Sequence, residues 1–140
     1  MPTRTEAWEK EIAIEDECGE LKAIKLTGVK YTFEDGKQEI VRALRDRWVL
    51  INPIKDYSNA YKDIVIAVPF EHLTGREFTR NALLYTQFDE DLLEFVEREY
   101  HRIGARIMMN IGKHASEVHV HKQIIQVCGT QTIIPGMVKN

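Results

Sequence analysis

The sequence predicts an α+β fold in which one long helix packs on an antiparallel β-sheet. Three observations lead to this prediction. Short apolar runs bounded by turn residues, which are typical of strands, fill much of the first half of the chain. The hydrophobic period then changes to three or four residues over residues 89–103, as in an amphipathic helix. Strand-like runs return afterwards, so the 140 residues are expected to form a single domain.

The first half of the chain contains one weak helical pattern and several strand patterns. Residues 4–17 are expected to form a short acidic helix. β-rich runs lie on either side of Asp35-Gly36, and this dipeptide predicts a hairpin because both residues tolerate positive φ. The apolar runs at residues 47–54 and 63–70 each predict a strand that is closed by a proline.

The second half contains the clearest helix. Acidic residues stand where a helix starts and Gly104 stands where one ends, so residues 89–103 are predicted to be helical. Residues 105–111, 117–127 and 130–136 predict strands, the second of them in a central antiparallel sheet beside the first. The helix is expected to face the sheet through its apolar stripe, which consists of Leu92, Val96, Tyr100 and Ile103.

Composition excludes several classes of protein. The net charge of −3 offers no basic field for nucleic acid. The two cysteines, Cys18 and Cys128, lie far apart and outside any CxxC motif, which favours a reducing compartment. The charged N-terminus has no signal-peptide pattern, and no apolar run has the length of a membrane span. We therefore expect a soluble cytoplasmic protein that binds neither nucleic acid nor membrane.

A row of polar side chains follows the predicted strand at residues 117–127. Because side chains alternate between the faces of a strand, His119, His121 and Gln123 share one face with Ile125. The row is roughly 13 Å long at about 3.3 Å per residue. Such a row can follow a phosphate chain, one imidazole attacking phosphorus while its neighbours donate hydrogen bonds. Spacing alone leaves two alternatives open, a solvated strand face and a metal site on the two histidines.

The segment NIGKHASEVHVHKQII resembles the signature of the histidine-triad (HIT-like) superfamily. In that signature an Asn, a Gly, a small residue and a Ser or Thr precede His-x-His-x-His. Gln123 replaces the third histidine, as in the branch that contains galactose-1-phosphate uridylyltransferase and the dinucleoside-polyphosphate phosphorylases. The other matching positions are Asn110, Gly112, Ala115, Ser116, His119 and His121.

The resemblance covers roughly residues 46–127 and extends to the two apolar runs upstream. It implies a HIT-like antiparallel sheet with one long helix packed on it. The chain departs from the family in two places. The loop at residues 110–119 is shorter than usual, and Leu50 stands where the family often has an acid for the ribose hydroxyls.

The resemblance also implies roles for the row. His121 matches the nucleophile, which attacks the α-phosphorus and forms a covalent nucleotidyl-histidine, and His119 supports it. Gln123 would donate a hydrogen bond to an oxygen of the intermediate, and Ser116 would contact the phosphate. Asn110 and Gly112 would belong to the phosphate loop. The implied function is nucleotidyl transfer, phosphorolysis or hydrolysis of a nucleotide or nucleotide-sugar phosphoanhydride.

Other assignments remain open. The domain is alternatively a catalytically silent module that binds a nucleotide or a protein partner. No cofactor is firmly implied, although a zinc ion held by His72 and His119, or by these two and Cys128, is a weaker alternative. His101 falls on the polar side of the predicted helix and is expected to be solvated. Proteins of the superfamily often dimerise, so a homodimer is expected.

Overall fold

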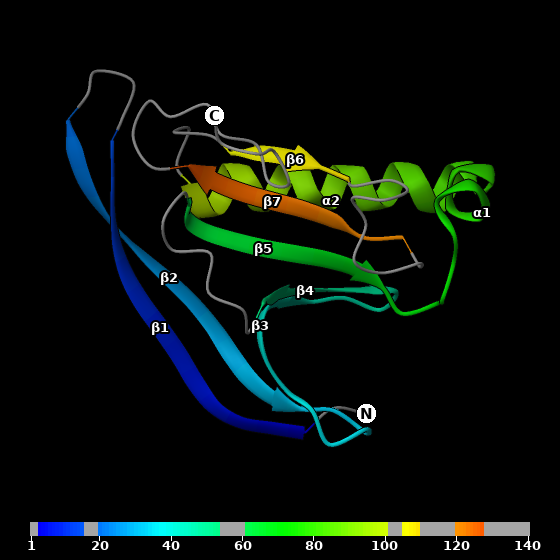
Figure 1. Cartoon of the computed structure of the whole chain (residues 1–140), viewed down its shortest axis with the longest axis horizontal. Helices are drawn as coiled ribbons and strands as arrows, with labels where there is room; N and C mark the ends of the chain where they lie inside the picture. Colours follow the sequence, from blue (N-terminus) through cyan, green and yellow to red (C-terminus); the bar gives the residue numbers. More distant parts are fainter. Residues whose placement is uncertain (1–2, 16–19, 54–60, 101–104, 110–119, 128–140) are drawn as a thin grey trace, which may run out of the picture.

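The computed structural model describes residues 3–15, 20–53, 61–100, 105–109 and 120–127. Within them, seven strands form one antiparallel sheet in the order β1-β2-β3-β4-β5-β7-β6, and the long helix α2 packs on one face (Figure 1). The expected α+β class is therefore confirmed. The bounds are β1 Thr3–Glu15, β2 Leu21–Thr32, β3 Gln38–Leu44, β4 Trp48–Asn52, β5 Tyr61–Pro69, α1 Gly75–Arg80, α2 Ala82–Tyr100, β6 Arg106–Met108 and β7 Lys122–Val127.

The helix expected at residues 4–17 is wrong, because the described part of this segment, up to Glu15, belongs to β1 and pairs with β2. Trp8 and Ile12 are four residues apart, and this spacing fits both a helical stripe and one face of a strand. The structure resolves the ambiguity through partners that lie far along the chain. Trp8 pairs with Gly28 and Ile12 with Ile24, and Ile12 and Ile24 are both buried in the core.

The hairpin predicted at Asp35-Gly36 is confirmed and joins β2 to β3. Gly36 has a φ of 84°, and its N–H donates to the carbonyl of Phe33 at 2.9 Å. The N–H of Lys37 donates to Oδ1 of Asp35 at 3.0 Å. The aspartate therefore stabilises the turn through its side chain, while the glycine supplies the positive φ.

The sheet forks between β2 and β3. Their pairing stops after Val29 and Val41, and β3 shifts its register against β4 between Val41 and Ala43. Arg42 is the extra residue of this bulge. Its Nε donates to the carbonyl of Thr27 at 3.1 Å, just beyond the last β2–β3 pair. The side chain thus satisfies a backbone group that would otherwise lose its partner where the strands separate.

Gly28 at this fork allows a close approach that a larger residue would prevent. A Cβ there would lie 2.8 Å from the carbonyl oxygen of Val41, so the backbone of one strand would have to move. Gly28→Ala is therefore expected to lower the free energy of unfolding by about 1–3 kcal/mol, measured by urea denaturation. The control is Gly75→Ala, where, among the described residues, no atom outside the neighbouring backbone lies within 4 Å of the added Cβ. That change is expected to be neutral or stabilising by up to about 1 kcal/mol. Equal losses in the two variants would contradict the argument.

Helix α2 begins at Ala82 rather than at residue 89. Oδ1 of Asn81 accepts a hydrogen bond from the N–H of Leu84 at 3.2 Å, as an N-cap side chain does. The preceding short helix α1 is capped by Thr74, whose side chain and backbone exchange hydrogen bonds with Glu77. These capping signals are present in the sequence, and the expectation missed them because it relied on the acidic residues at 89 and 91.

The core lies between α2 and the sheet. The predicted stripe residues Leu92 and Tyr100 are buried and Val96 is partly buried, while Ile103 lies outside the described residues. Phe88 packs edge to face against Trp48, with ring centroids 5.4 Å apart. The indole Nε1 of Trp48 donates to Asp91 at 2.6 Å. This aromatic packing holds the helix at a fixed place on the sheet.

Strands β6 and β7 are shorter than the expected runs at residues 105–111 and 117–127. Strand β7 lies between β5 and β6 and pairs antiparallel with both, so it lies in the antiparallel sheet beside the strand from the run at residues 105–111, as expected. Val120 and His121 precede it outside the strand. Residues 117–119 of the expected run at 117–127 lie outside the described part of the chain, and so does the whole expected run at residues 130–136.

Candidate functional site

The structure describes three of the residues that the sequence singled out. His121 lies immediately before β7, Gln123 lies in β7, and His72 is exposed in the segment between β5 and α1. The remaining candidates lie outside the described residues: His119, Ser116, Asn110, Gly112, Ala115, His101 and Cys128.

The two faces of β7 have different surroundings. Nζ of Lys122 lies 2.6 Å from Oδ1 of Asp89 on α2, and it lies 4.6 Å from the ring centre of Tyr85 on the same helix. Ile124 belongs to the core cluster that includes α2. Lys122 and Ile124 therefore face the helix, and alternation places Gln123 on the opposite face.

His121 continues this alternation immediately before the strand. Val120 belongs to the core cluster and Lys122 contacts α2, so the side chain between them is directed away from the helix. The N–H of Val120 donates to the carbonyl of Leu73 at 2.6 Å. This bond ties the backbone beside His121 to the segment that contains His72. His121 itself is only 5% exposed.

The side-chain amide oxygen of Gln123 is unsatisfied. This Oε1 atom is buried, and within the described part of the chain it has no hydrogen-bond partner. A buried polar atom without a partner costs about 1–3 kcal/mol, so a group that supplies the partner would bind with that gain. The oxygen and nitrogen of an amide are interchangeable by rotation of the group, so Gln123 can offer an acceptor or a donor here.

An apolar row leads away from Gln123 across the sheet. Gln123 pairs with Ile66 of β5, Ile66 with Ile51 of β4, Ile51 with Val41 of β3, and Val41 with Val29 of β2. Directly paired residues share a face of the sheet, so all these side chains lie on the face opposite α2. At about 4.8 Å per strand the row covers roughly 14 Å from Gln123 to Val41.

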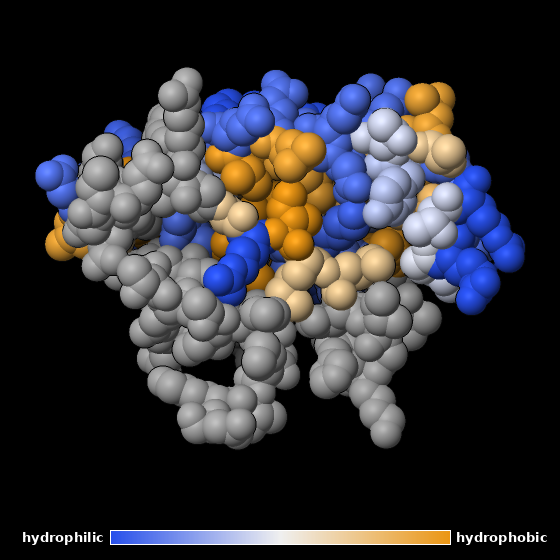
Figure 2. All heavy atoms as spheres, turned by 90° about the horizontal axis from the view of Figure 1, so that it is seen from above, coloured by the Kyte–Doolittle hydropathy of each residue, from blue (hydrophilic) through white to orange (hydrophobic). Residues whose placement is uncertain are grey.

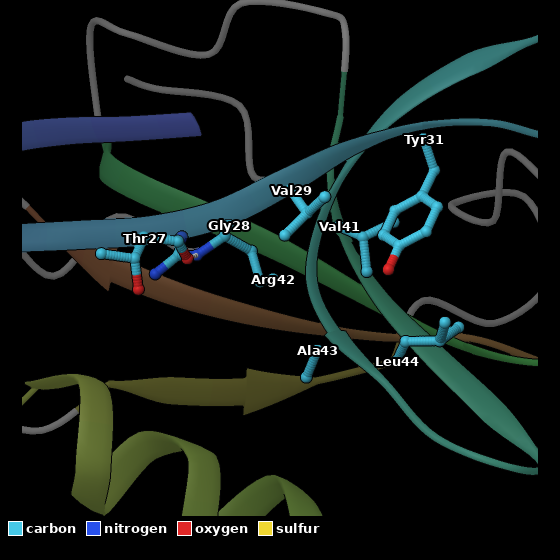
Figure 3. A pocket seen from close by; sticks show the side chains of 8 residues that line it. All are labelled: Thr27, Gly28, Val29, Tyr31, Val41, Arg42, Ala43 and Leu44. Atoms are coloured by element: carbon cyan, nitrogen blue, oxygen red, sulfur yellow. Dashed lines mark hydrogen bonds between the residues drawn. The ribbon is translucent and has the colours of Figure 1, made fainter. Parts of the chain in front are cut away.

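The far end of this row opens into a cleft at the β2–β3 fork. Its volume is about 330 Å³. Figure 3 shows the ring of Tyr31 beside Val41, with Val29 next to Val41 and Arg42 beside Gly28 and Thr27. Its wall is of mixed character, with the apolar side chains of Val29 and Val41 beside the polar groups of Thr27, Tyr31 and Arg42. The lining residues are Thr27, Gly28, Val29, Tyr31, Val41, Arg42, Ala43 and Leu44.

Leu50 does not take part in this face. It is fully buried in the core, and it pairs with Ala67, which in turn pairs with Lys122. These three residues face α2. Leu50 therefore does not lie on the face of Gln123, because period-two alternation presents Ile51 to that face instead.

A buried polar network on the α2 face was not expected from the sequence. NH1 of Arg42 lies 2.7 Å from Oδ2 of Asp63, and NH2 lies 3.1 Å from Oε1 of Glu99. Asn52 and Tyr100 also donate to Asp63, at 2.9 and 2.8 Å. Although burial lowers the pKa of Arg42, the charge of Asp63 and its hydrogen bond raise it above the ordinary value.

This network joins the fork of the sheet to the end of α2, and its groups satisfy one another. Such mutual pairing is typical of a structural ion pair rather than of a reactive group. The signal in the sequence was the position of an arginine and an aspartate inside runs that are otherwise apolar, at positions 42 and 63.

The network makes stability sensitive to alkaline pH. Burial raises the pKa of Tyr100 well above its ordinary value, and the charge of Asp63 adds to this effect. Above the ordinary tyrosine pKa the unfolded chain loses this proton while the folded chain keeps it, so stability falls as pH rises. The slope from one such group is up to about 1.4 kcal/mol per pH unit. Tyr100→Phe should reduce the slope of unfolding free energy against pH above pH ~10, and an unchanged slope would contradict the assignment.

Comparison with known proteins adds no assignment. No family model matches the chain, and no match was found among curated proteins or among solved structures. Among the described residues, no helix combines the length and apolar character needed to cross a membrane. In the same part of the chain, no group of three or more His, Cys, Asp and Glu residues is placed to hold a metal ion. His119, the partner of His72 in the zinc alternative, lies outside it.

Proposed function

We propose that this protein transfers a nucleotidyl group by the route of the HIT-like superfamily, with His121 as the nucleophile. One observation carries the proposal. On the face opposite α2, the unsatisfied amide oxygen of Gln123 stands at the head of the apolar row that ends in the cleft. A nucleotide has the same division, since its phosphate is polar and charged and the two faces of its flat base are apolar.

In the proposed reaction the phosphate lies at His121 and Gln123. The lone pair of Nε2 of His121 forms a bond to the α-phosphorus, and the bond from that phosphorus to its bridging oxygen breaks. The leaving group departs with the electron pair. In the second step an acceptor oxygen displaces the histidine, and its proton passes to solvent or to a base. Gln123 donates a hydrogen bond to a non-bridging oxygen and supplies no proton, so the leaving group is weakly basic or is protonated from outside.

The base lies over the apolar row in this proposal. Ile66 and Ile51 are the first two side chains after Gln123, and both are partly exposed. Arg42 does not provide a second phosphate site in the cleft, because Asp63 and Glu99 already neutralise its charge. In this proposal the charged end of the ligand therefore lies at β7, and its apolar end points toward β3.

The test is intact-mass spectrometry after incubation with nucleoside triphosphates, nucleotide sugars and dinucleoside polyphosphates in turn. At least one of these should add the mass of a single nucleotidyl group, and the adduct should disappear when an acceptor such as phosphate or a sugar phosphate is added. Binding should be measured in parallel by calorimetry. A panel that gives neither an adduct nor turnover would contradict the enzymatic proposal.

The second candidate is a catalytically silent module that binds a nucleotide or a protein partner. The low exposure of His121, 5%, favours it, because a buried imidazole presents little surface to an incoming phosphorus. This candidate predicts nucleotide binding in the calorimeter with no adduct and no turnover. The same pair of measurements therefore separates the two functions.

A further inference from the structure

Strand β1 is an edge strand of unusual length. It is the first strand in the sheet order, and in the part of the chain that the structure describes only β2 pairs with it (Figure 1). Its Thr3–Glu15 span contains no proline, and its register shifts only between Arg4 and Glu6. Such an edge presents a row of backbone donors and acceptors to another strand.

The charges along β1 decide which strand fits this edge. Glu6, Trp8 and Lys10 alternate with Ala7 and Glu9, so they lie on one face of β1. Trp8 marks this as the inner face, because Arg42 lies 5.8 Å from its ring centre. A charged Lys10 on the inner face of an edge strand would disfavour pairing with an apolar or basic partner strand. A partner strand must therefore carry an acid opposite Lys10.

A second copy of β1 meets this requirement in one antiparallel register. In an antiparallel pair related by a two-fold axis, the numbers of the two paired residues always add up to the same total. Paired side chains lie on the same face of the joined sheet only when the axis passes through a residue, which then pairs with its own copy. With the axis at Trp8, Lys10 of each copy faces Glu6 of the other, and Glu9 faces Ala7. With the axis at Ala7, Lys10 faces Arg4. Axes at Glu6, Glu9, Lys10 or Glu11 each place a charged residue opposite itself.

We propose that two copies of this chain associate through antiparallel pairing of their β1 strands about Trp8, which joins two sheets into one. The four residues at the centre of the interface are exposed and available to a partner: Glu6, Ala7, Glu9 and Lys10. Glu6 lies 3.3 Å from Lys30 of its own protomer, and Lys30 is 37% exposed, so this exposed pair is weak and can be shared. The proposal does not depend on the nucleotidyl-transfer function.

The test uses two charge reversals, Lys10→Glu and Glu6→Lys. Each alone places like charges opposite each other at both ends of the interface. Sedimentation equilibrium of the wild type should give a dimer, and each variant should dissociate at least about tenfold more readily. An equimolar mixture of the two variants restores opposite charges at both positions, so it should form a heterodimer. The double variant Glu6→Lys/Lys10→Glu should dimerise as the wild type does.

Lys37→Glu is the matched control, because Lys37 is an exposed lysine that lies between β2 and β3, away from the β1 edge. It should leave the dimer unchanged. Circular dichroism should show the same fold in every variant, since all the changed side chains are exposed. A monomeric wild type at all concentrations would overturn the proposal. So would dimers of both single variants as stable as the wild type, or a mixture that fails to associate.

Discussion

His121→Asn is expected to lower turnover of the nucleotide substrate by about three orders of magnitude or more, the usual result when a covalent nucleophile is removed. Asparagine keeps a polar side chain of comparable reach, but it cannot form the bond to phosphorus. The adduct seen by mass spectrometry should disappear in the same variant. Nucleotide affinity should change much less, because Gln123 and the apolar row remain.

The control for this prediction is His101→Asn, the same substitution at the histidine that the sequence assigns to a solvated position. It should retain both adduct and turnover. Replacing His119 should weaken the support of His121 in the site and lower the stability of the protein. The covalent bond should still form on His121. If His121→Asn turned over its substrate at the wild-type rate, the proposed nucleophile would be wrong and the binding module would take its place.

Arg42→Met is expected to lower the free energy of unfolding by about 3–5 kcal/mol, the range measured when one partner of a buried ion pair is removed. The side chain of Arg42 is 0% exposed and that of Asp63 is 4% exposed, so the carboxylate would stay buried beside Asn52 and Tyr100 without its cation. The backbone carbonyl of Thr27 would lose its partner at the fork as well. Methionine keeps much of the apolar stem, so the loss reports mainly on charge and hydrogen bonds.

Arg47→Met is the matched control, because it breaks an ion pair on the surface. NH2 of Arg47 lies 3.5 Å from Glu71, and the two side chains are 52% and 63% exposed. An exposed pair of this kind contributes about 0–1 kcal/mol. Both variants should be unfolded in urea under the same conditions and compared with the wild type. A loss for Arg42→Met as small as that for Arg47→Met would show that the buried network does not hold β3 to α2.

Local patterns in the sequence were sufficient for several features. Asp35-Gly36 specifies its turn because the side chain and the positive φ act within four residues. Alternation from Lys122 to Ile124 predicts which side chains share a face, because the pleat of a strand has a strict period of two. The apolar stripe through Leu92 predicts the helix in the same way, because a helix also has a regular period along the chain. In each case the residues that interact are close together in the chain.

Other features depend on contacts between residues that are far apart in the sequence. The pattern at Trp8 and Ile12 fits two periods, and only pairing with Gly28 and Ile24 makes the segment a strand. Strand register across the sheet, which a local pattern does not contain, turns Leu50 toward the helix. The same register aligns Gln123 with the apolar row. Spacing along the chain therefore determined which residues alternate or repeat, whereas tertiary pairing decided which face each one shares and what it meets there.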